Sequence, residues 1–296
     1  MPEISVIMPS YNHQKYISEA IDSVLKQSFK DIELIIIQDG YLENMIKIIE
    51  HYARLDRRIV LKISNERIGV AKAFNLGLDT ASGKYVAFIG SDDVWLENKL
   101  EVQLQYLRNY PGTIVWSDAL IIDGESKELG YKFSDLYQAE KRSGYIFNEL
   151  CFGNFISGQS QIFERNLLNG MRFDDTILIL NDYKFNLDLS FKYKFVFINL
   201  VLVKYRMHRT NLTNLGGKTW STDSTKMIKY ILSTYENYIS KEVKFYLLLR
   251  LSGSQFILKN FRSSFSNALN SLKFIGFKSL QLLVKRLKMH YNHINP

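Results

Sequence analysis

The 296-residue sequence predicts an α/β fold with a Rossmann-like, mostly parallel central sheet, flanked by helices and followed by a C-terminal helical extension. Three observations predict it. Short runs rich in isoleucine and valine begin at intervals of about 25 to 30 residues, segments with helical spacing separate them, and the last quarter of the chain carries helical spacing only.

The apolar runs are the predicted strands of the parallel sheet. They cover residues 4–8, 34–37, 59–63, 85–89 and 114–116. Strands buried on both faces have this almost continuous isoleucine and valine content. Apolar residues recur at helical spacing over 16–25 and again over 96–107, which predicts crossover helices between the strands.

The pattern becomes less regular beyond the fifth strand. Residues 121–154 contain several glycines and many charges, whereas 181–191 predict a helix and 195–205 a strand. From residue 221 onward the sequence predicts helices, including one over 277–291, and we place the main domain boundary near residue 219.

Composition excludes several classes of protein. Hydrophobic residues make up 46% of the chain and charged residues 23%, which is ordinary for a globular protein and argues against disorder. A single cysteine, Cys151, excludes an intrachain disulfide and is compatible with a reducing compartment. No signal peptide or membrane-spanning stretch is recognisable, so we expect a cytoplasmic protein.

The net charge of +8 is unevenly distributed. Residues 221–296 hold 12 Lys and Arg against 3 Asp and Glu, whereas residues 1–220 hold 26 against 27. The excess of positive charge therefore belongs to the C-terminal quarter.

Polar residues follow the predicted strands at the carboxyl edge of the sheet, where ligands bind in open α/β folds. They are "PSYNH" after the first strand, "QDG" after the second, "SNERIGVAKAFNLG" after the third and "SDD" after the fourth. Asp39, Asp92 and Asp93 should therefore converge. Neighbouring carboxylates repel unless a cation offsets them, and oxygen ligands favour Mg²⁺ or Mn²⁺.

A structural alternative is that Ser91 or Asp92 caps a helix beginning near Val94. The combination with Asp39 and the loop over 65–77 favours the ligand-binding interpretation. The chain lacks a GxxxxGK[ST] loop and a GxGxxG fingerprint, which argues against P-loop nucleotide triphosphatases and dinucleotide-dependent dehydrogenases.

Four segments, in order, resemble the successive motifs of family 2 glycosyltransferases. They are "ISVIMPSYNHQKYISEAIDSVLKQSF", "ELIIIQDG", "NERIGVAKAFNLGL" and "GKYVAFIGSDDVWLENKLEVQ". Many positions match the family's motifs over residues 4–107, fewer match up to about residue 213, and the resemblance is lost in the C-terminal quarter. It implies a GT-A fold, a nucleotide-diphosphate sugar as donor, with UDP favoured, and Mn²⁺ or Mg²⁺ as cofactor.

The same resemblance implies roles for the residues at the donor site. Pro9, Tyr11 and Asp39 would hold the nucleotide base, and Arg67 and Lys72 would lie near the base or the diphosphate. Asp92 would contact the ribose or the metal, and Asp93 would bind the metal. The structural alternatives to nucleotide binding are that Tyr11 packs within its loop and that Asp39-Gly40 forms a turn.

Further residues follow from the later, looser part of the resemblance. Asp182, in "NDYKFNLDL", matches the catalytic base, with a helix cap as its alternative. Gly158 and Gln159 match the floor under the donor sugar. Arg206 and His208, in "YRMHRTNLT", match a segment that meets the diphosphate or the metal, or they are ordinary structural residues.

Three positions depart from the family's pattern. Gly90 stands where the first acid of a DSDD motif is usual, and Gln38 and Asn181 each replace the first acid of an acidic pair. Fold is therefore predicted more firmly than activity.

The basic C-terminal region has two interpretations that the sequence leaves open. It is either a cationic amphipathic surface on an anionic membrane or a solvated helical cap on the domain. No nucleic-acid-binding module is present, so we expect no nucleic acid as partner.

The sequence thus predicts a GT-A glycosyltransferase domain over 1–219, with a nucleotide-binding half (1–118) and an acceptor-binding half (119–219), and a basic helical region over 220–296. The expected function is metal-dependent, inverting transfer of a hexose or N-acetylhexosamine from an NDP-sugar to a glycan or lipid-linked acceptor. By analogy with the family, the setting would be bacterial surface polysaccharide synthesis. The alternatives are a catalytically inert relative that binds nucleotide or glycan and, less favoured, a sugar nucleotidyltransferase.

Overall fold

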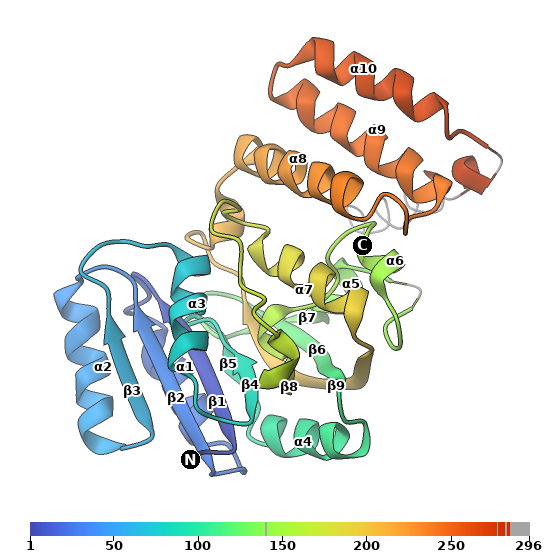
Figure 1. Cartoon of the computed structure of the whole chain (residues 1–296). Coiled ribbons are helices and arrows are strands. Elements are labelled where there is room, and N and C mark those ends of the chain that lie inside the picture. Colours follow the sequence, from blue (N-terminus) through green and yellow to red (C-terminus); the bar gives the residue numbers. More distant parts are fainter. Residues whose placement is uncertain (140, 277, 282, 285–296) are drawn as a thin grey trace.

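The computed structural model describes residues 1–139, 141–276, 278–281 and 283–284. Within these residues, nine strands form one mixed, mostly parallel sheet in the order β3-β2-β1-β4-β8-β6-β9-β5, with β7 paired to β6 (Figure 1). The strands are β1 (Ile4–Ser10), β2 (Ile32–Gln38), β3 (Ile59–Ile63), β4 (Tyr85–Phe88), β5 (Val94–Trp95), β6 (Ile114–Ile122), β7 (Glu128–Lys132), β8 (Ile162–Glu164) and β9 (Phe195–Arg206).

The helices follow the strands in the expected alternation up to residue 109. They are α1 (Ile17–Leu25), α2 (Glu43–Leu55), α3 (Val70–Thr80), α4 (Lys99–Asn109), α5 (Phe133–Leu136), α6 (Phe147–Leu150), α7 (Asn181–Lys192), α8 (Gly217–Thr234), α9 (Lys241–Ile257) and α10 (Phe261–Leu272). Short 3₁₀ turns lie at Gly158–Ser160 (η1), Arg165–Leu168 (η2) and Leu212–Asn214 (η3).

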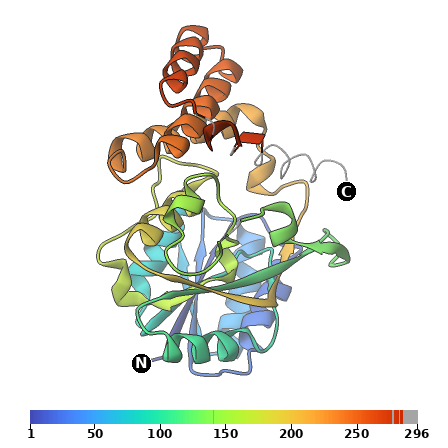
Figure 2. The same ribbon diagram turned by 90° about the vertical axis from the view of Figure 1, so that its right-hand side faces the viewer.

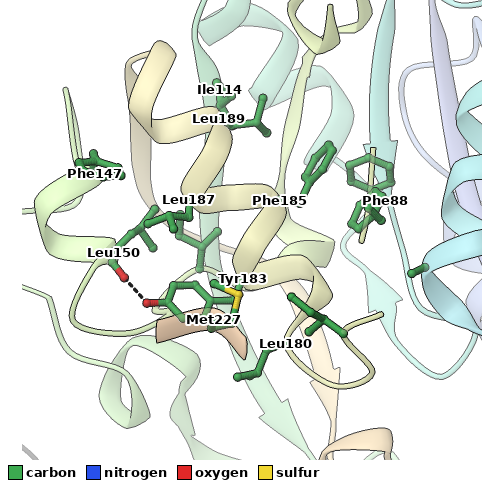
Figure 3. Close-up of a cluster of buried hydrophobic side chains, with 14 of the residues drawn as sticks. Phe88, Ile114, Phe147, Leu150, Leu180, Tyr183, Phe185, Leu187, Leu189 and Met227 are labelled. Atoms are coloured by element: carbon green, nitrogen blue, oxygen red, sulfur yellow. Dashed lines mark hydrogen bonds between the residues drawn. The ribbon is translucent and has the colours of Figure 1, made fainter. Parts of the chain in front are cut away.

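The two faces of the sheet bury separate apolar clusters, because successive side chains of a strand point to opposite faces. On one face, Ile4, Val6 and Met8 of β1 pack with α1, α2 and α4. On the other, Ile7 joins side chains from α3, α6, α7, α8 and α9. Figure 3 shows part of this second cluster, in which Tyr183 and Phe185 of α7 lie among residues of β4, α6 and α8.

The C-terminal helices lie together at one end of the molecule, with α8 beside α7 and α10 farthest from the sheet (Figures 1 and 2). Met227, Ile228 and Ile231 of α8 are buried in the same cluster as α7. Helix α8 begins two residues before the predicted boundary near residue 219, and the division into domains stays a prediction.

The structure confirms the predicted α/β class, the five predicted strands and the helices of the C-terminal region. It differs in the segment after Asp93. The short strand β5 occupies Val94–Trp95 and the next helix begins only at Lys99, so Ser91 and Asp92 do not cap a helix near Val94. Most of the predicted helix over 277–291 lies outside the described residues.

Candidate functional site

The site lies where several strands end at the same edge of the sheet. Strands β1, β2 and β4 are parallel neighbours, and β6 and β9 run in the same direction because β8 is antiparallel to both β4 and β6. The loops after β1, β4 and β9 therefore meet, although they are far apart in the sequence.

Asp93 is the most deeply buried carboxyl of the site. Its Oδ1 accepts a hydrogen bond from the backbone N–H of Arg206 at 2.8 Å. Its buried Oδ2 has no hydrogen-bond donor among the described residues. Burial raises the pKa of Asp93 well above its usual value, the charge of Asp92 adds to this, and Arg206 opposes it. An unpaired buried carboxylate oxygen is costly, so this atom is suited to a bound cation.

Asp92 lies between two imidazoles. Its Oδ2 is 3.0 Å from Nε2 of His208 and 3.8 Å from Nε2 of His13. The side-chain amide of Asn211 donates to the same oxygen at 3.5 Å. Burial alone would raise the pKa of Asp92, but the hydrogen bond to His208 and the charges of both histidines lower it below the usual value. Asp92 is therefore the carboxylate that stays ionised.

Gly90 leaves room for both carboxylates. A Cβ atom at this position would lie 2.6 Å from Oδ1 of Asp92 and 2.9 Å from Oδ2 of Asp93. An aspartate at residue 90 would therefore displace one of the two side chains. Glycine at residue 90, where the DSDD pattern has an acid, therefore leaves the space that the side chains of Asp92 and Asp93 occupy.

Arg206 holds the loops of this site together. Its buried guanidinium donates to the carbonyl oxygen of Asp92 at 2.6 Å and pairs with Glu19 of α1 at 2.6 Å. It also donates to the Asp123 carbonyl and to Ser126 after β6. The structure places Arg206 beside the predicted metal ligands, and its contact with a diphosphate stays a prediction.

The residues predicted to bind the nucleotide lie on the loops after β1 to β3. The guanidinium of Arg67 stacks on the ring of Tyr11, 4.2 Å from its centroid. Asp39 is buried, and its two oxygens accept the backbone N–H groups of Ile68 at 2.5 Å and Gly69 at 3.0 Å. Asp39 therefore shapes the loop that carries Arg67, and its contact with a base stays a prediction.

The two remaining predicted donor-site residues lie on regular elements. Pro9 belongs to β1, in register with Ile37 of β2. Lys72, in the first turn of α3, forms an exposed ion pair with Asp175 at 3.4 Å. The Lys72 pair links the first half of the chain to the loop before α7. Gln38, where the family usually has an acid, accepts from Ser10 at 3.2 Å and donates to the Gly40 carbonyl at 3.0 Å.

Asp182 forms a second carboxyl site, in the first turn of α7. Its neighbour Tyr183 donates its hydroxyl to the Leu150 carbonyl, which fixes the start of the helix in the apolar cluster (Figure 3). Burial raises the pKa of Asp182 to about 6, against hydrogen bonds from the Tyr183 N–H and the Asn154 side chain. No side chain caps α7, so the structure does not support the helix-cap alternative for Asp182 or Asn181.

Helix α8 also positions the start of α7. The buried carboxylate of Asp223 accepts the backbone N–H of Ile179 at 2.6 Å and that of Leu180 at 3.4 Å, directly before α7. Further along α7, Asp188 accepts the hydroxyls of Tyr230 and Tyr235, each at 2.8 Å. The C-terminal helices are thus part of the framework that holds Asp182.

The two carboxyl sites are connected by residues that lie near both. A Cβ atom at Gly158 would lie 3.7 Å from Oδ2 of Asp182, and the adjacent Gln159 side chain lowers the pKa of Asp93. Burial raises the pKa of Tyr137, and the charge of Asp182 adds to this. Burial also raises the pKa of Tyr205, to which Asp93, Asp92 and Tyr137 contribute. The segment 158–159 therefore lies between the two carboxyl sites, and its contact with a donor sugar stays a prediction.

Comparison with known proteins identifies the family. The sequence model of the glycosyl transferase family 2 matches residues 5–169, more than half of the chain. The chain belongs to this family. A putative teichuronic acid biosynthesis glycosyltransferase, TuaG of Bacillus subtilis, is 42% identical over 106 residues, which is 36% of this chain and 42% of the relative.

Two solved structures show that this glycosyltransferase has the GT-A fold. S. aureus TarS in complex with UDP-GlcNAc superposes with a TM-score of 0.62 at 17% identity, covering 92% of this chain and 80% of TarS. A mannosyltransferase from Pyrobaculum calidifontis, in complex with GDP-Man and Mn²⁺, gives 0.61 at 14% identity, covering 97% of this chain and 80% of the other.

The donor set of this glycosyltransferase fits a divalent cation. Donor atoms of His13, Asp92 and His208 lie within 4.8 Å of one another, and the unpaired Oδ2 of Asp93 is buried beside them. Imidazole nitrogens and carboxylate oxygens together suit divalent metals such as Mn²⁺. Burial lowers the pKa of His13, with His208 contributing and Asp92 opposing, and this favours the neutral form of the imidazole, which is the form that binds metals.

Several residues of the site were missed by the sequence reasoning. His13 stood in the quoted strand-end segment "PSYNH" and could have been found from its position after β1. Glu19, Asn154, Asn211 and Asp223 gave no comparable signal, because only the tertiary structure brings them to the site.

Proposed function

We propose that this glycosyltransferase moves a hexose or N-acetylhexosamine from a UDP-sugar to a hydroxyl of a glycan or lipid-linked acceptor, with inversion at the anomeric carbon. One observation carries the proposal. The buried carboxyl of Asp182, whose pKa is about 6, lies across Gly158 and Gln159 from the cluster of Asp92, Asp93 and His208. A base on one side of this segment and a site suited to a divalent cation on the other are the parts that a metal-assisted direct displacement requires.

In the proposed reaction, Asp182 accepts the proton of the acceptor hydroxyl. A carboxyl with a pKa of about 6 is mostly ionised at pH 7 and is a stronger base than an exposed aspartate. The acceptor oxygen forms a bond to the anomeric carbon as the bond to the diphosphate oxygen breaks, and the diphosphate leaves with the electron pair. Attack from the opposite side inverts the configuration.

Asp92, Asp93 and His208 would hold a divalent cation, which when bound would neutralise charge on the diphosphate. Their positions are fixed independently of it. Arg206 donates to the backbone carbonyl of Asp92 and, through its own N–H, to the side chain of Asp93. Asn211 and Thr210 orient the loop of His208. Such a pre-organised arrangement needs little rearrangement when the donor binds.

Similarity to the relatives supports the donor class and the biological setting. TarS binds UDP-GlcNAc, and the Pyrobaculum enzyme binds GDP-Man with Mn²⁺. TuaG is assigned to teichuronic acid biosynthesis. We therefore favour UDP over GDP and a cell-surface polysaccharide as the product.

A panel of NDP-sugars tests the reaction. The protein is incubated with each donor, Mn²⁺ and candidate acceptors, released UDP or GDP is measured, and the anomeric configuration of the product is determined by NMR. We expect UDP release that requires Asp182 and a product of inverted configuration. A retained configuration would exclude direct displacement, and diphosphate release from a sugar phosphate and UTP would instead identify a nucleotidyltransferase.

The inert-relative alternative remains a defined outcome of this test, because Gly90, Gln38 and Asn181 each replace an acid usual in the family. Calorimetry with UDP and Mn²⁺ separates the cases. Binding without turnover of any donor, in the presence of acceptors of each class, would favour a protein that only binds nucleotide.

For the acceptor, we propose a lipid-linked glycan approached through α10. This helix exposes an apolar stripe at helical spacing, formed by Phe261, Phe265, Leu269 and Leu272, and buries Ser264 and Ser271 instead. Beyond Glu242 the chain contains no acidic residue, and Lys259, Arg262 and Lys273 flank the stripe. An exposed apolar stripe beside basic residues matches an anionic lipid surface.

Among the described residues, no helix combines the length and apolar content needed to cross a membrane. Surface contact is therefore tested by flotation with vesicles of phosphatidylcholine, alone or with phosphatidylglycerol. We expect binding only to the anionic vesicles, and F265S combined with L269S should reduce it at least tenfold. L55S, which changes an exposed leucine on α2, is the control. Equal binding by all three proteins would overturn the assignment to α10.

A further inference from the structure

His13 lies beside the metal ligands that the sequence predicted, although the sequence analysis did not name it as a ligand. It follows β1, whereas Asp92 follows β4 and His208 follows β9. The His13 and His208 rings are nearly perpendicular, with centroids 5.5 Å apart. The Nε2 atoms of both rings lie near one oxygen, Oδ2 of Asp92, at 3.8 and 3.0 Å.

Both imidazoles are oriented by a hydroxyl on their other nitrogen. Nδ1 of His13 lies 2.9 Å from Oγ of Ser91, and Nδ1 of His208 lies 2.8 Å from Oγ1 of Thr210. When Nδ1 donates its proton to the hydroxyl, the lone pair of Nε2 can bind an ion; at His208 the ion would then replace the Nε2 hydrogen bond to Asp92. Metal-binding histidines are usually held in this way, with one nitrogen fixed by a hydrogen bond and the other directed at the ion.

The third observation concerns the carboxylate that this chain lacks. At residue 90 a side chain would collide with Asp92 and Asp93, at 2.6 and 2.9 Å from a Cβ atom, so no third acid can enter from that position without rearrangement. His13 instead approaches Asp92 from the β1 loop. It brings a nitrogen donor to Asp92 from a different loop.

We propose that His13 is a metal ligand of this glycosyltransferase in addition to Asp92, Asp93 and His208, and that the two imidazoles of the site select Mn²⁺ over Mg²⁺. The proposal rests on the metal dependence stated under the proposed function. Mg²⁺ prefers oxygen ligands and keeps several waters, whereas Mn²⁺ lies above it in affinity for imidazole nitrogen. Two nitrogen donors therefore shift the preference towards Mn²⁺.

Calorimetric titration of the UDP-bound protein with Mn²⁺ and with Mg²⁺ tests the selectivity. We expect the wild-type protein to bind Mn²⁺ at least tenfold more tightly than Mg²⁺. H13A should weaken Mn²⁺ binding at least tenfold and narrow the difference between the metals. H51A removes an exposed histidine of α2 and is the matched control, expected to behave as wild type. Unchanged Mn²⁺ affinity in H13A would overturn the proposal.

Pulsed EPR of Mn²⁺ bound to the wild-type protein gives a second measurement that needs no turnover and no variant. Electron spin echo modulation counts the coordinated nitrogens, and we expect two; one nitrogen would overturn the assignment of His13 even if H13A failed to fold. Mn²⁺ binding to the UDP-bound protein could be retained in H13A and lost in H208A. This result would reject His13 as a ligand and leave the metal role in the proposed function intact. The absence of any metal binding by wild type would reject the metal role in the proposed function as well.

Discussion

The two carboxyl sites of this glycosyltransferase are built in contrasting ways. Asp92 and Asp93 end a strand at the sheet edge, where histidines, an asparagine and the Arg206 backbone meet their oxygens. Asp182 lies in the first turn of α7, beside Tyr183 of the apolar cluster, and burial raises its pKa to about 6 against the hydrogen bonds that it accepts. Polar surroundings suit a site that binds a cation, and apolar surroundings suit a base.

Among substitutions at the two carboxyl sites, we expect D182N to have the largest effect on activity. It removes the base and retains the shape of the side chain, so we expect transfer to fall by about 10³-fold, within the range of general-base catalysis. Binding of UDP and Mn²⁺, measured by calorimetry, should be unchanged. A variant with more than a tenth of wild-type kcat would show that another group accepts the proton.

D93N should affect the other site alone. Loss of the buried anionic oxygen is expected to weaken Mn²⁺ binding to the UDP-bound protein about 10- to 100-fold, as found when metal sites lose an interacting group. D79N, which changes an exposed aspartate of α3, is the control. Full Mn²⁺ affinity in D93N would mean that the oxygen is not used by the cation.

D182N should also make the protein more stable. The folded pKa of about 6 exceeds the ordinary value of 3.8, so ionising Asp182 costs folding free energy as pH rises from about 4 through 6. The neutral variant avoids this cost, and we expect it to gain about 3 kcal/mol at pH 7.5 in urea denaturation. The difference should shrink as pH falls from 6 to 4 and vanish below about pH 3, where the carboxyl is protonated in both states. A constant difference would point to packing instead.

The pH dependence of catalysis sharpens the same comparison. Since Asp182 must be ionised, log(kcat/KM) should fall with unit slope below about pH 6 and be level above it. Metal-saturated assays between pH 5 and 8 would measure this. If log(kcat/KM) began to fall only near the usual aspartate pKa, the buried environment of Asp182 would not be retained during catalysis.

R67A should give the smallest effect, because it removes only the guanidinium stacked on Tyr11. A cation–π contact at a partly exposed site contributes about 1 kcal/mol, so we expect KM for the donor to rise about fivefold with kcat unchanged. Initial-rate kinetics at varied donor concentration test this. A fall in kcat alone would place Arg67 at the reacting atoms instead.

The sequence by itself determined the parallel half of the sheet and the position of its ligand-binding edge. The strands β1 to β4 follow from isoleucine-rich runs that only a doubly covered sheet can bury, and the polar residues after them must then share one edge. The sequence did not reveal β8, which has three residues and is antiparallel, because so short a run lacks a recognisable period.

Only the tertiary structure decided which side chains meet. His13 and Asp92 are separated by 79 positions, and Asp223 and Leu180 by 43, yet each pair is in contact because separate loops and helices pack at one place. The raised pKa of Asp182 likewise depends on its burial at the start of α7, a helix that packs against β4, α6 and α8 in one apolar cluster. Local periodicity fixes which face of an element is buried, but the electric environment of a carboxyl depends on groups contributed from elsewhere in the chain.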